Sequence, residues 1–165
     1  MTSERDSLYL VRDPQAGDFD IIVERQWRVY ESEYGWNSDF RDILVDIIQK
    51  YQAEFDQSLD RCWIAEKEGQ VVGSIFVVKH DQTTAKLRML YVDSSARGLG
   101  IGKRLIEETI NFARQSGYKR MVLWTMSVLT TARGLYQRAG FNLVEEEKVQ
   151  SFGKDLVSQT WSLDL

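Results

Sequence analysis

The spacing of apolar residues predicts two long helices in the first third of the chain. Between Asp18 and Tyr34 apolar side chains recur every three or four positions, and the same periodicity continues from Ser38 to Glu54 after an interruption at Gly35. This spacing places the apolar residues on one face of a helix. We therefore expect amphipathic helices at about 18–34 and 38–54.

Segments rich in β-branched and aromatic residues predict the strands. We expect them at 9–12, 61–67, 71–79, 83–92, 120–124, 141–149 and 156–163. The strand at 120–124 reads as fully buried, and further helices are expected at about 101–116 and 130–138. The order β-α-α-β-β-β-α-β-α-β-β indicates an α/β (α+β) chain, with four helices and a mixed, mostly antiparallel sheet of about seven strands.

Composition narrows the class of protein. The 165 residues, 43% of them apolar, predict one domain over 1–165, with residues 1–7 flexible. A single Cys, a single His and a single Pro exclude a disulfide framework and predict no metal site. Cys62 lies in an apolar segment and is expected to be a buried thiol, whereas His80 is expected in a surface turn.

Charge and hydropathy bear on the binding partners and the cellular location of the protein. The net charge is −4 and the basic residues are scattered, which argues against nucleic acid as a partner. No apolar segment reaches the length of about 18 residues that a membrane span needs. The first seven residues are polar, unlike a signal peptide. We expect a cytoplasmic protein with no membrane partner.

Residues 97–103 carry the clearest chemistry. Glycines occupy positions 98, 100 and 102 between an apolar strand and an amphipathic helix, and Arg97 and Lys103 flank them. Glycine lets the backbone approach a ligand closely, and the first N–H groups of a helix favour an anion. The pattern predicts a pyrophosphate site. Arg104 follows Gly102-Lys103 where a Walker loop needs Ser or Thr, and the spacing is one residue short of a dinucleotide fingerprint.

Two motifs resemble those of the GCN5-related N-acetyltransferases, the GNAT superfamily. Residues 90–103 are similar to the cofactor motif R/Q-x-x-G-x-G/A, and residues 132–141 to the motif A-x-x-L-Y-x-x-x-G-F. More narrowly, residues 86–90, 124–125 and 151–165 resemble acetyltransferase domains fused to MarR-type regulators. The resemblance implies a GNAT-like acyl-CoA N-acyltransferase fold, with acetyl-CoA as co-substrate and no metal.

The resemblance also implies roles for particular residues. Tyr136 matches the family tyrosine that donates a proton to the departing CoA thiolate, although it could instead pack in the core. A backbone N–H near Tyr91 or Val92 would stabilise the developing oxyanion. The residues implied to bind the cofactor are Leu90, Tyr91, Val92, Arg97, Gly98, Leu99, Gly100, Ile101, Gly102 and Lys103.

The chain departs from the family pattern at two places. Leu129 stands where many relatives carry an asparagine that bonds to the cofactor, and Ser127, Thr130 and Thr131 are candidate substitutes. We expect one of these three to cap the helix that follows. The strand before the glycine-rich turn also lacks the glutamate that serves as the base in the family, since it reads Lys86-Leu87-Arg88. Glu31, Glu33, a chain of waters and an amine that arrives neutral are the alternatives.

The acceptor site is expected around the interruption between the first two helices. Glu31, Glu33, Tyr34 and Trp36 would suit a cationic amine. Arg88, with Lys86 beside it, would instead suit a carboxylate. We interpret the sequence as that of an enzyme that transfers an acetyl group directly to a primary amine of a small molecule or peptide, in a ternary complex. A non-catalytic acyl-CoA-binding or sensing module and an adenine-nucleotide-binding protein of another fold are the alternatives, and family members often form homodimers.

Overall fold

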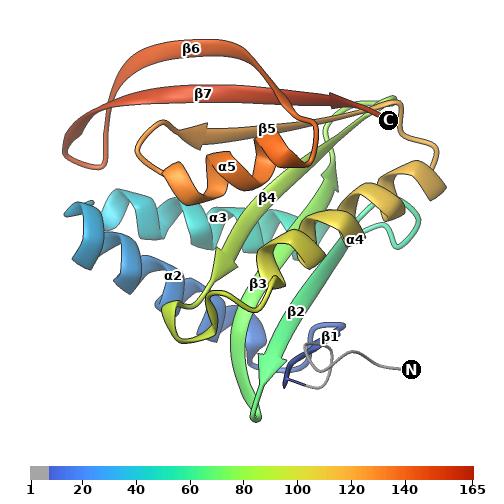
Figure 1. Cartoon of the computed structure of the whole chain (residues 1–165), viewed down its shortest axis with the longest axis horizontal. Helices are drawn as coiled ribbons and strands as arrows, with labels where there is room; N and C mark the ends of the chain where they lie inside the picture. The colour runs from blue at the N-terminus through green and yellow to red at the C-terminus, as the bar shows by residue number, and fades with distance from the viewer. Residues whose placement is uncertain (1–7) are drawn as a thin grey trace.

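The computed structural model describes residues 8–165, which form one seven-stranded sheet with helices on both faces (Figure 1). The strands are β1 (Leu10–Arg12), β2 (Arg61–Lys67), β3 (Gln70–Lys79), β4 (Thr84–Val92), β5 (Arg120–Met126), β6 (Asn142–Ser151) and β7 (Lys154–Asp164). The helices are α2 (Asp18–Tyr34), α3 (Ser38–Glu54), α4 (Ile101–Gln115) and α5 (Thr130–Arg138), with a 3-10 turn, η1 (Ser94–Ala96). The predicted fold class and element order are confirmed. The flexibility expected of residues 1–7 lies outside the described residues.

Local sequence signals account for the corner between α2 and α3. Gly35 adopts a left-handed conformation with φ of 68°, and its N–H donates to the carbonyl of Glu31, which ends α2. Asn37 caps α3, since its side-chain oxygen accepts from the N–H of Asp39 at 3.0 Å. The two helices therefore begin and end where the sequence predicts, at 18–34 and 38–54.

The sheet has the strand order β1-β2-β3-β4-β5-β7-β6. Its pairs are antiparallel except β4 and β5, which are parallel and joined through α4. One apolar core, which includes Ile22, Leu44 and Phe76, lies between the sheet and the pair α2 and α3. The other, which includes Leu105 and Leu123, lies on the face covered by α4 and α5.

The burial of single residues tests several predictions. Cys62 is fully buried, as predicted, and burial raises the pKa of its thiol well above the usual value. His80 is exposed in the turn after β3, as predicted. The prediction that 120–124 is fully buried was wrong, because Arg120 is exposed and Trp124 is 43% exposed. Trp124 lies on the part of β5 that has lost its β4 partner.

No helix within residues 8–165 combines the length and apolar character that crossing a membrane requires.

Candidate functional site

The strands β4 and β5 separate in the middle of the sheet. They pair from Thr84 opposite Arg120 to Leu87 opposite Leu123, and their register ends there. Figure 1 shows the two strands starting together and diverging, with α5 close to the opening. The edge of β4 beyond residue 87 is therefore free of β5 and open to a ligand that could pair with it.

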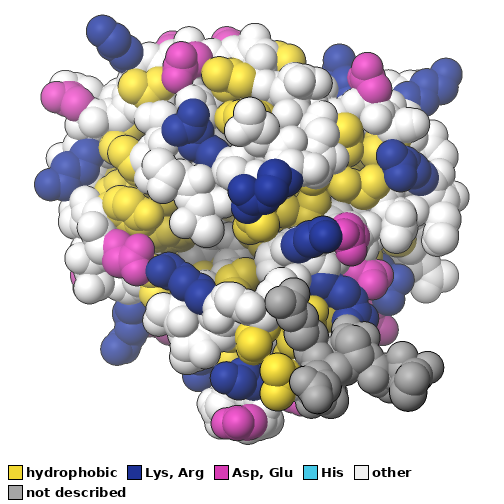
Figure 2. Space-filling view, viewed as in Figure 1, with side chains coloured by type: hydrophobic (Ala, Val, Ile, Leu, Met, Phe, Trp, Pro, Cys, Tyr) yellow, Lys and Arg dark blue, Asp and Glu magenta, His cyan; other side chains and the backbone are white. Residues whose placement is uncertain are grey.

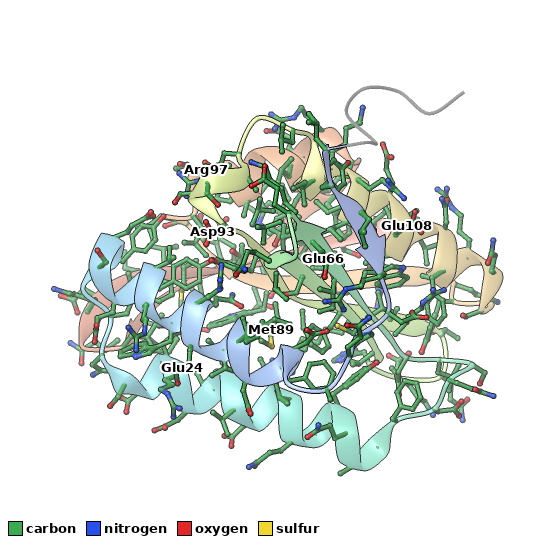
Figure 3. The ribbon with its side chains drawn as sticks, turned by 90° about the horizontal axis from the view of Figure 1, so that it is seen from below. Glu24, Glu66, Met89, Asp93, Arg97 and Glu108 are labelled. Carbon is green, nitrogen blue, oxygen red and sulfur yellow. The ribbon has the colours of Figure 1, made fainter. Side chains whose placement is uncertain are left out.

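A bulge sets the direction of this free edge. The register between β3 and β4 shifts between Ser74 and Phe76, and Met89 opposite the shift has a left-handed φ of 54°. This conformation is costly for a non-glycine residue. Met89 packs on the side of the sheet covered by α2 and α3 (Figure 3). Gly73 makes room for the bulged strand, because a Cβ there would lie 2.8 Å from the carbonyl oxygen of Tyr91.

Asp93 anchors the turn that follows β4. Its carboxylate accepts hydrogen bonds from the Tyr91 hydroxyl at 2.7 Å and from the N–H of Ser95 at 3.0 Å, and lies 3.8 Å from the Arg25 guanidinium. Burial raises the pKa of Asp93, but these donors outweigh burial and lower the pKa overall. The ionised carboxylate thus fixes the start of the glycine-rich turn, which also carries Arg97 (Figure 3).

The glycine-rich turn has the geometry of an anion site. Gly98 and Gly100 have φ of 83° and 79°, and a Cβ on either would meet nothing within 4 Å. The helix α4 begins without a side-chain cap. Within the described part of the chain, the backbone N–H groups of residues 98–103 have no hydrogen-bond partner. Such N–H groups at a helix N-terminus bind phosphate.

Gly102 differs from the other two glycines of the turn. It is buried, and a Cβ there would lie 2.8 Å from Cδ1 of Leu135. A glycine at this position lets α4 pack closely against α5. The space beside the Cα of Gly102, which we expected a ligand to fill, is therefore occupied by Leu135. The backbone N–H of Gly102 is still one of the N–H groups without a hydrogen-bond partner among the described residues.

A cleft of about 270 Å³ joins the turn to the free edge of β4. Figure 2 shows a hollow on this face, with apolar side chains in it and Lys and Arg side chains around it. Nine of the ten residues predicted to bind the cofactor line the cleft. The exception is Leu99, whose side chain packs against the core under α4. Arg97 at the rim pairs with Glu33 at 3.6 Å.

A second cleft of about 100 Å³ adjoins the first on the side of α2 and α3. The two share Tyr30, Leu90, Leu129 and Ala132 in their linings. Tyr136 lines the second cleft, is 5% exposed, and has no hydrogen-bond partner for its hydroxyl among the described residues. Burial raises its pKa, with a smaller contribution from Tyr30, so the hydroxyl keeps its proton.

Four of the five residues predicted for the acceptor site are divided between the two clefts. Trp36 lines the second cleft and is buried, with its ring stacked on Tyr30 at 5.1 Å. Arg88 lines the second cleft as well. Tyr34 and Glu33 line the first. Glu31 is exposed and lies in neither lining.

The predicted cap of α5 was wrong. The helix begins after Leu129, and no side chain caps it. The carbonyl of Ser127 accepts from the Arg133 guanidinium at 2.9 Å, and Thr131 lines the first cleft. Sequence reasoning also missed Trp124 and Tyr30 as lining residues. The spacing of Tyr30 four positions before Tyr34 on α2 is the signal that could have indicated it.

Comparison with known proteins agrees with this geometry. The family model described as the acetyltransferase (GNAT) family matches residues 19–141. The chain belongs to the GNAT acetyltransferase family. Both clefts are built largely from residues within the matched range.

Individual relatives resemble the chain over part of their length. Human N-acetyltransferase 8B is 36% identical over 106 residues, covering 61% of this chain and 45% of that protein. N-acetylaspartate synthetase of Danio rerio is 41% identical over 85 residues, covering 51% of this chain and 30% of that protein. The chain thus spans less than half the length of these two relatives.

A solved acetyltransferase structure has the same fold. The structure of yncA from Salmonella typhimurium, determined with its cofactor acetyl-CoA, superposes with a TM-score of 0.75 at 20% identity and covers 95% of this chain and 94% of that one. At this identity the likeness concerns the fold alone.

Proposed function

We propose that this chain transfers an acetyl group from acetyl-CoA to a primary amine of a small molecule or peptide, by direct attack in a ternary complex. The observation that carries the proposal is the row of unpartnered backbone N–H groups at 98–103, which opens into the same cleft as the free edge of β4. Membership of the GNAT family supports it.

The residues present fit acetyl-CoA. The N–H groups of 98–103, with Arg97 and Lys103, would hold the pyrophosphate. The edge of β4 at Leu90, Tyr91 and Val92 would hold the pantetheine arm by strand-like hydrogen bonds. When bound, acetyl-CoA would supply the acetyl group as a thioester.

The chain supplies two groups for the chemistry. A backbone N–H at Tyr91 or Val92 donates to the carbonyl oxygen as negative charge develops on it. Tyr136 donates its phenolic proton to the departing sulfur. Because burial raises the pKa of Tyr136, its hydroxyl is protonated at neutral pH and can act as the proton donor.

Direct transfer is favoured over a covalent acetyl-enzyme. Cys62 is fully buried in the core and its thiol has a raised pKa, so it is a poor nucleophile. The amine loses its proton to water or to a carboxylate. Of the two carboxylates considered, Glu33 lies at the first cleft but pairs with Arg97, and Glu31 lies outside both clefts.

The relatives also support a proposal for the substrate and the partners of the chain. The name of the Danio rerio relative, N-acetylaspartate synthetase, indicates an amino acid derivative as that protein's product and supports a small-molecule amine here. We further propose a single domain over 1–165 that acts in the cytoplasm, alone or as a homodimer, without nucleic acid or membrane. The narrower resemblance to domains fused to MarR-type regulators stays a prediction.

An acyl-CoA-sensing module without catalysis is the second candidate. Leu129 in place of the family asparagine favours it. Purified chain should bind CoA in calorimetry and release free CoA thiol from acetyl-CoA when amines are added. CoA binding without thiol release from any amine would favour the sensor, and absence of CoA binding would refute both candidates.

A further inference from the structure

The second cleft has a positively charged wall. Lys86 and Arg88 lie two residues apart on β4, so both side chains are on the sheet face covered by α3. Each is half-buried. Burial lowers the pKa of Arg88, and burial together with the charges of Arg88 and Lys50 lowers that of Lys86. Two like charges are held close together in a partly dry site.

These two cations have no ion-pair partner within residues 8–165. Among the described residues, Lys86 and Arg88 form no ion pair or hydrogen bond, and no Asp or Glu lines the second cleft. On their far side they border a hollow whose lining includes Glu54, Asp56 and Asp60, but none of these carboxylates forms an ion pair with either cation. The Asp60 carboxylate accepts from the N–H groups of Asp56 and Lys79, and that of Asp56 accepts from Ser58. A half-buried cation without a partner is costly unless a ligand supplies the missing anion.

Most of the remaining lining of the second cleft is apolar or aromatic, although Gln26 and Thr125 also contribute to it. Trp124 of β5 is 43% exposed and lies in the lining with Ile43 and Ile47 of α3. An exposed indole inside a cleft is a surface for a flat or branched apolar group. Tyr136 lines the same cleft, which places these features next to the proposed proton donor.

We infer that the amine acceptor carries a carboxylate, which Arg88 binds with Lys86 beside it, and an apolar side chain, which lies against Trp124. The acceptor is thus of the class of aromatic or branched aliphatic amino acids. This inference rests on the proposed acetyltransferase function.

The reaction balances with these groups. The new bond joins the amine nitrogen to the acetyl carbon, the carbon–sulfur bond breaks, and the sulfur takes the proton of Tyr136. The proton lost by nitrogen passes to water and restores the tyrosine. Arg88 and Lys86 hold the carboxylate and exchange no proton.

Matched pairs of amines test the inference. Phenylalanine is compared with phenethylamine, and leucine with 3-methylbutylamine, so that only the carboxylate differs. We expect kcat/KM to be at least about tenfold higher for each acid, since a charge-assisted contact contributes that much. Equal or lower values for the acids would overturn the inference.

Variants of the full chain assign the effect to Arg88. Arg88→Met should lower the acid-to-amine ratio of kcat/KM about tenfold or more, and Arg88→Lys should retain part of it. Arg120→Met is the control, because Arg120 is an exposed cation of β5 that lines neither cleft. An Arg88→Met protein that melts like wild type and keeps the full ratio would overturn the inference.

A binding measurement separates this inference from the proposed function. N-acetylphenylalanine and N-acetylphenethylamine are titrated into the protein–CoA complex by calorimetry. Arg88-dependent binding of the acid alone, without turnover of any amine, would support the carboxylate site and refute the proposed activity. Turnover of amines with no Arg88-dependent binding of N-acetylphenylalanine would support the activity and overturn the carboxylate site, and failure of both measurements would overturn both.

Discussion

The guanidinium of Arg97 lies 3.6 Å from the carboxylate of Glu33, which ties the rim of the glycine-rich turn to the last turn of α2. Both side chains are about half exposed, so solvent screens the pair and it contributes little to stability. Its importance is electrostatic, because Glu33 places a negative charge beside a site for a polyanion. An anion that binds here must either share the Arg97 guanidinium with the Glu33 carboxylate or displace that carboxylate from it.

Removing the charge of Glu33 should therefore strengthen CoA binding. We expect Glu33→Gln to lower the Kd for CoA about two- to fivefold at low salt, and less at high salt, since exposed charges are screened. Arg97→Gln should raise the Kd about tenfold. Calorimetry at two salt concentrations checks both. Glu31→Gln, an exposed change on the same helix outside both clefts, should leave the Kd unchanged. A similar gain from Glu31→Gln would contradict the specific role of Glu33.

Gly100 and Gly117 separate backbone strain from ligand binding. They stand at opposite ends of α4 with φ of 79° and 87°, and a Cβ on either meets nothing within 4 Å. Valine at either position should lower the free energy of unfolding by about 1–3 kcal/mol, because a β-branched residue is strained there. Only Gly100→Val should abolish CoA binding. Loss of binding in Gly117→Val as well would mean that general destabilisation, not the anion site, is responsible.

Gly102 shows where the sequence could not decide the reason for a glycine. The spacing of 98, 100 and 102 predicts the same role for all three. The structure gives Gly102 a packing role against Leu135 on a helix some thirty residues later. Gly102→Glu is therefore expected to lower the melting temperature as well as CoA affinity, whereas from the sequence we would expect CoA binding alone to be lost.

The helices could be predicted closely because their signals are local. The bounds of α2, α3 and α5 follow from apolar periodicity and from residues such as Gly35 and Asn37 that end or begin helices. The exposure of Trp124 could not be predicted, because it depends on where β5 loses its pairing with β4. The left-handed Met89 likewise reflects a register shift against β3 rather than a preference of methionine.

The proton donor role of Tyr136 predicts a split between catalysis and binding. Tyr136→Phe should lower kcat about 100-fold and leave the Kd for CoA unchanged. Burial raises the pKa of the wild-type phenol, so its ionisation should not lower kcat below about pH 10. Tyr118→Phe is the control, since its hydroxyl donates to the carbonyl of Leu59 at 2.9 Å, outside both clefts. It should cost about 1 kcal/mol of stability and no activity. An equal loss of kcat in both variants would refute the assignment.

The ion pair between Arg12 and Asp18 predicts a pH dependence of stability. Burial raises the pKa of Asp18, but hydrogen bonds from Arg12 at 2.7 Å and from the N–H of Gln15 outweigh it, so the pKa in the folded state is lowered. The stabilisation is present above the unfolded value of about 3.9 and is lost as pH falls through the folded pKa.

Asp18→Asn should therefore cost about 2 kcal/mol at pH 7, because it leaves the partly buried Arg12 guanidinium with the Glu66 carboxylate, 3.3 Å away, as its remaining ion-pair partner, and the cost should shrink below about pH 4. Urea unfolding across this pH range measures it. Asp20→Asn, an exposed change in the same helical turn, should have little effect at any pH. A cost for Asp18→Asn that does not change with pH would show that the lost packing, not the charge, is responsible.

Phe152 at the tip of the β6–β7 hairpin combines buried packing with backbone strain. Its ring lies 4.8 Å from that of Trp36, its carbonyl accepts from the N–H of Asn37 at 3.0 Å, and its φ is 58°. Phe152→Ala should lower the free energy of unfolding by about 3–5 kcal/mol through the cavity that it leaves. Phe152→Gly leaves the same cavity but relieves the left-handed strain, so it should be more stable than Phe152→Ala by about 1 kcal/mol. Phe55→Ala, which removes a ring that is 50% exposed, should cost much less. Urea unfolding of the three variants gives the order, and an alanine variant as stable as the glycine variant would contradict the strained conformation at Phe152.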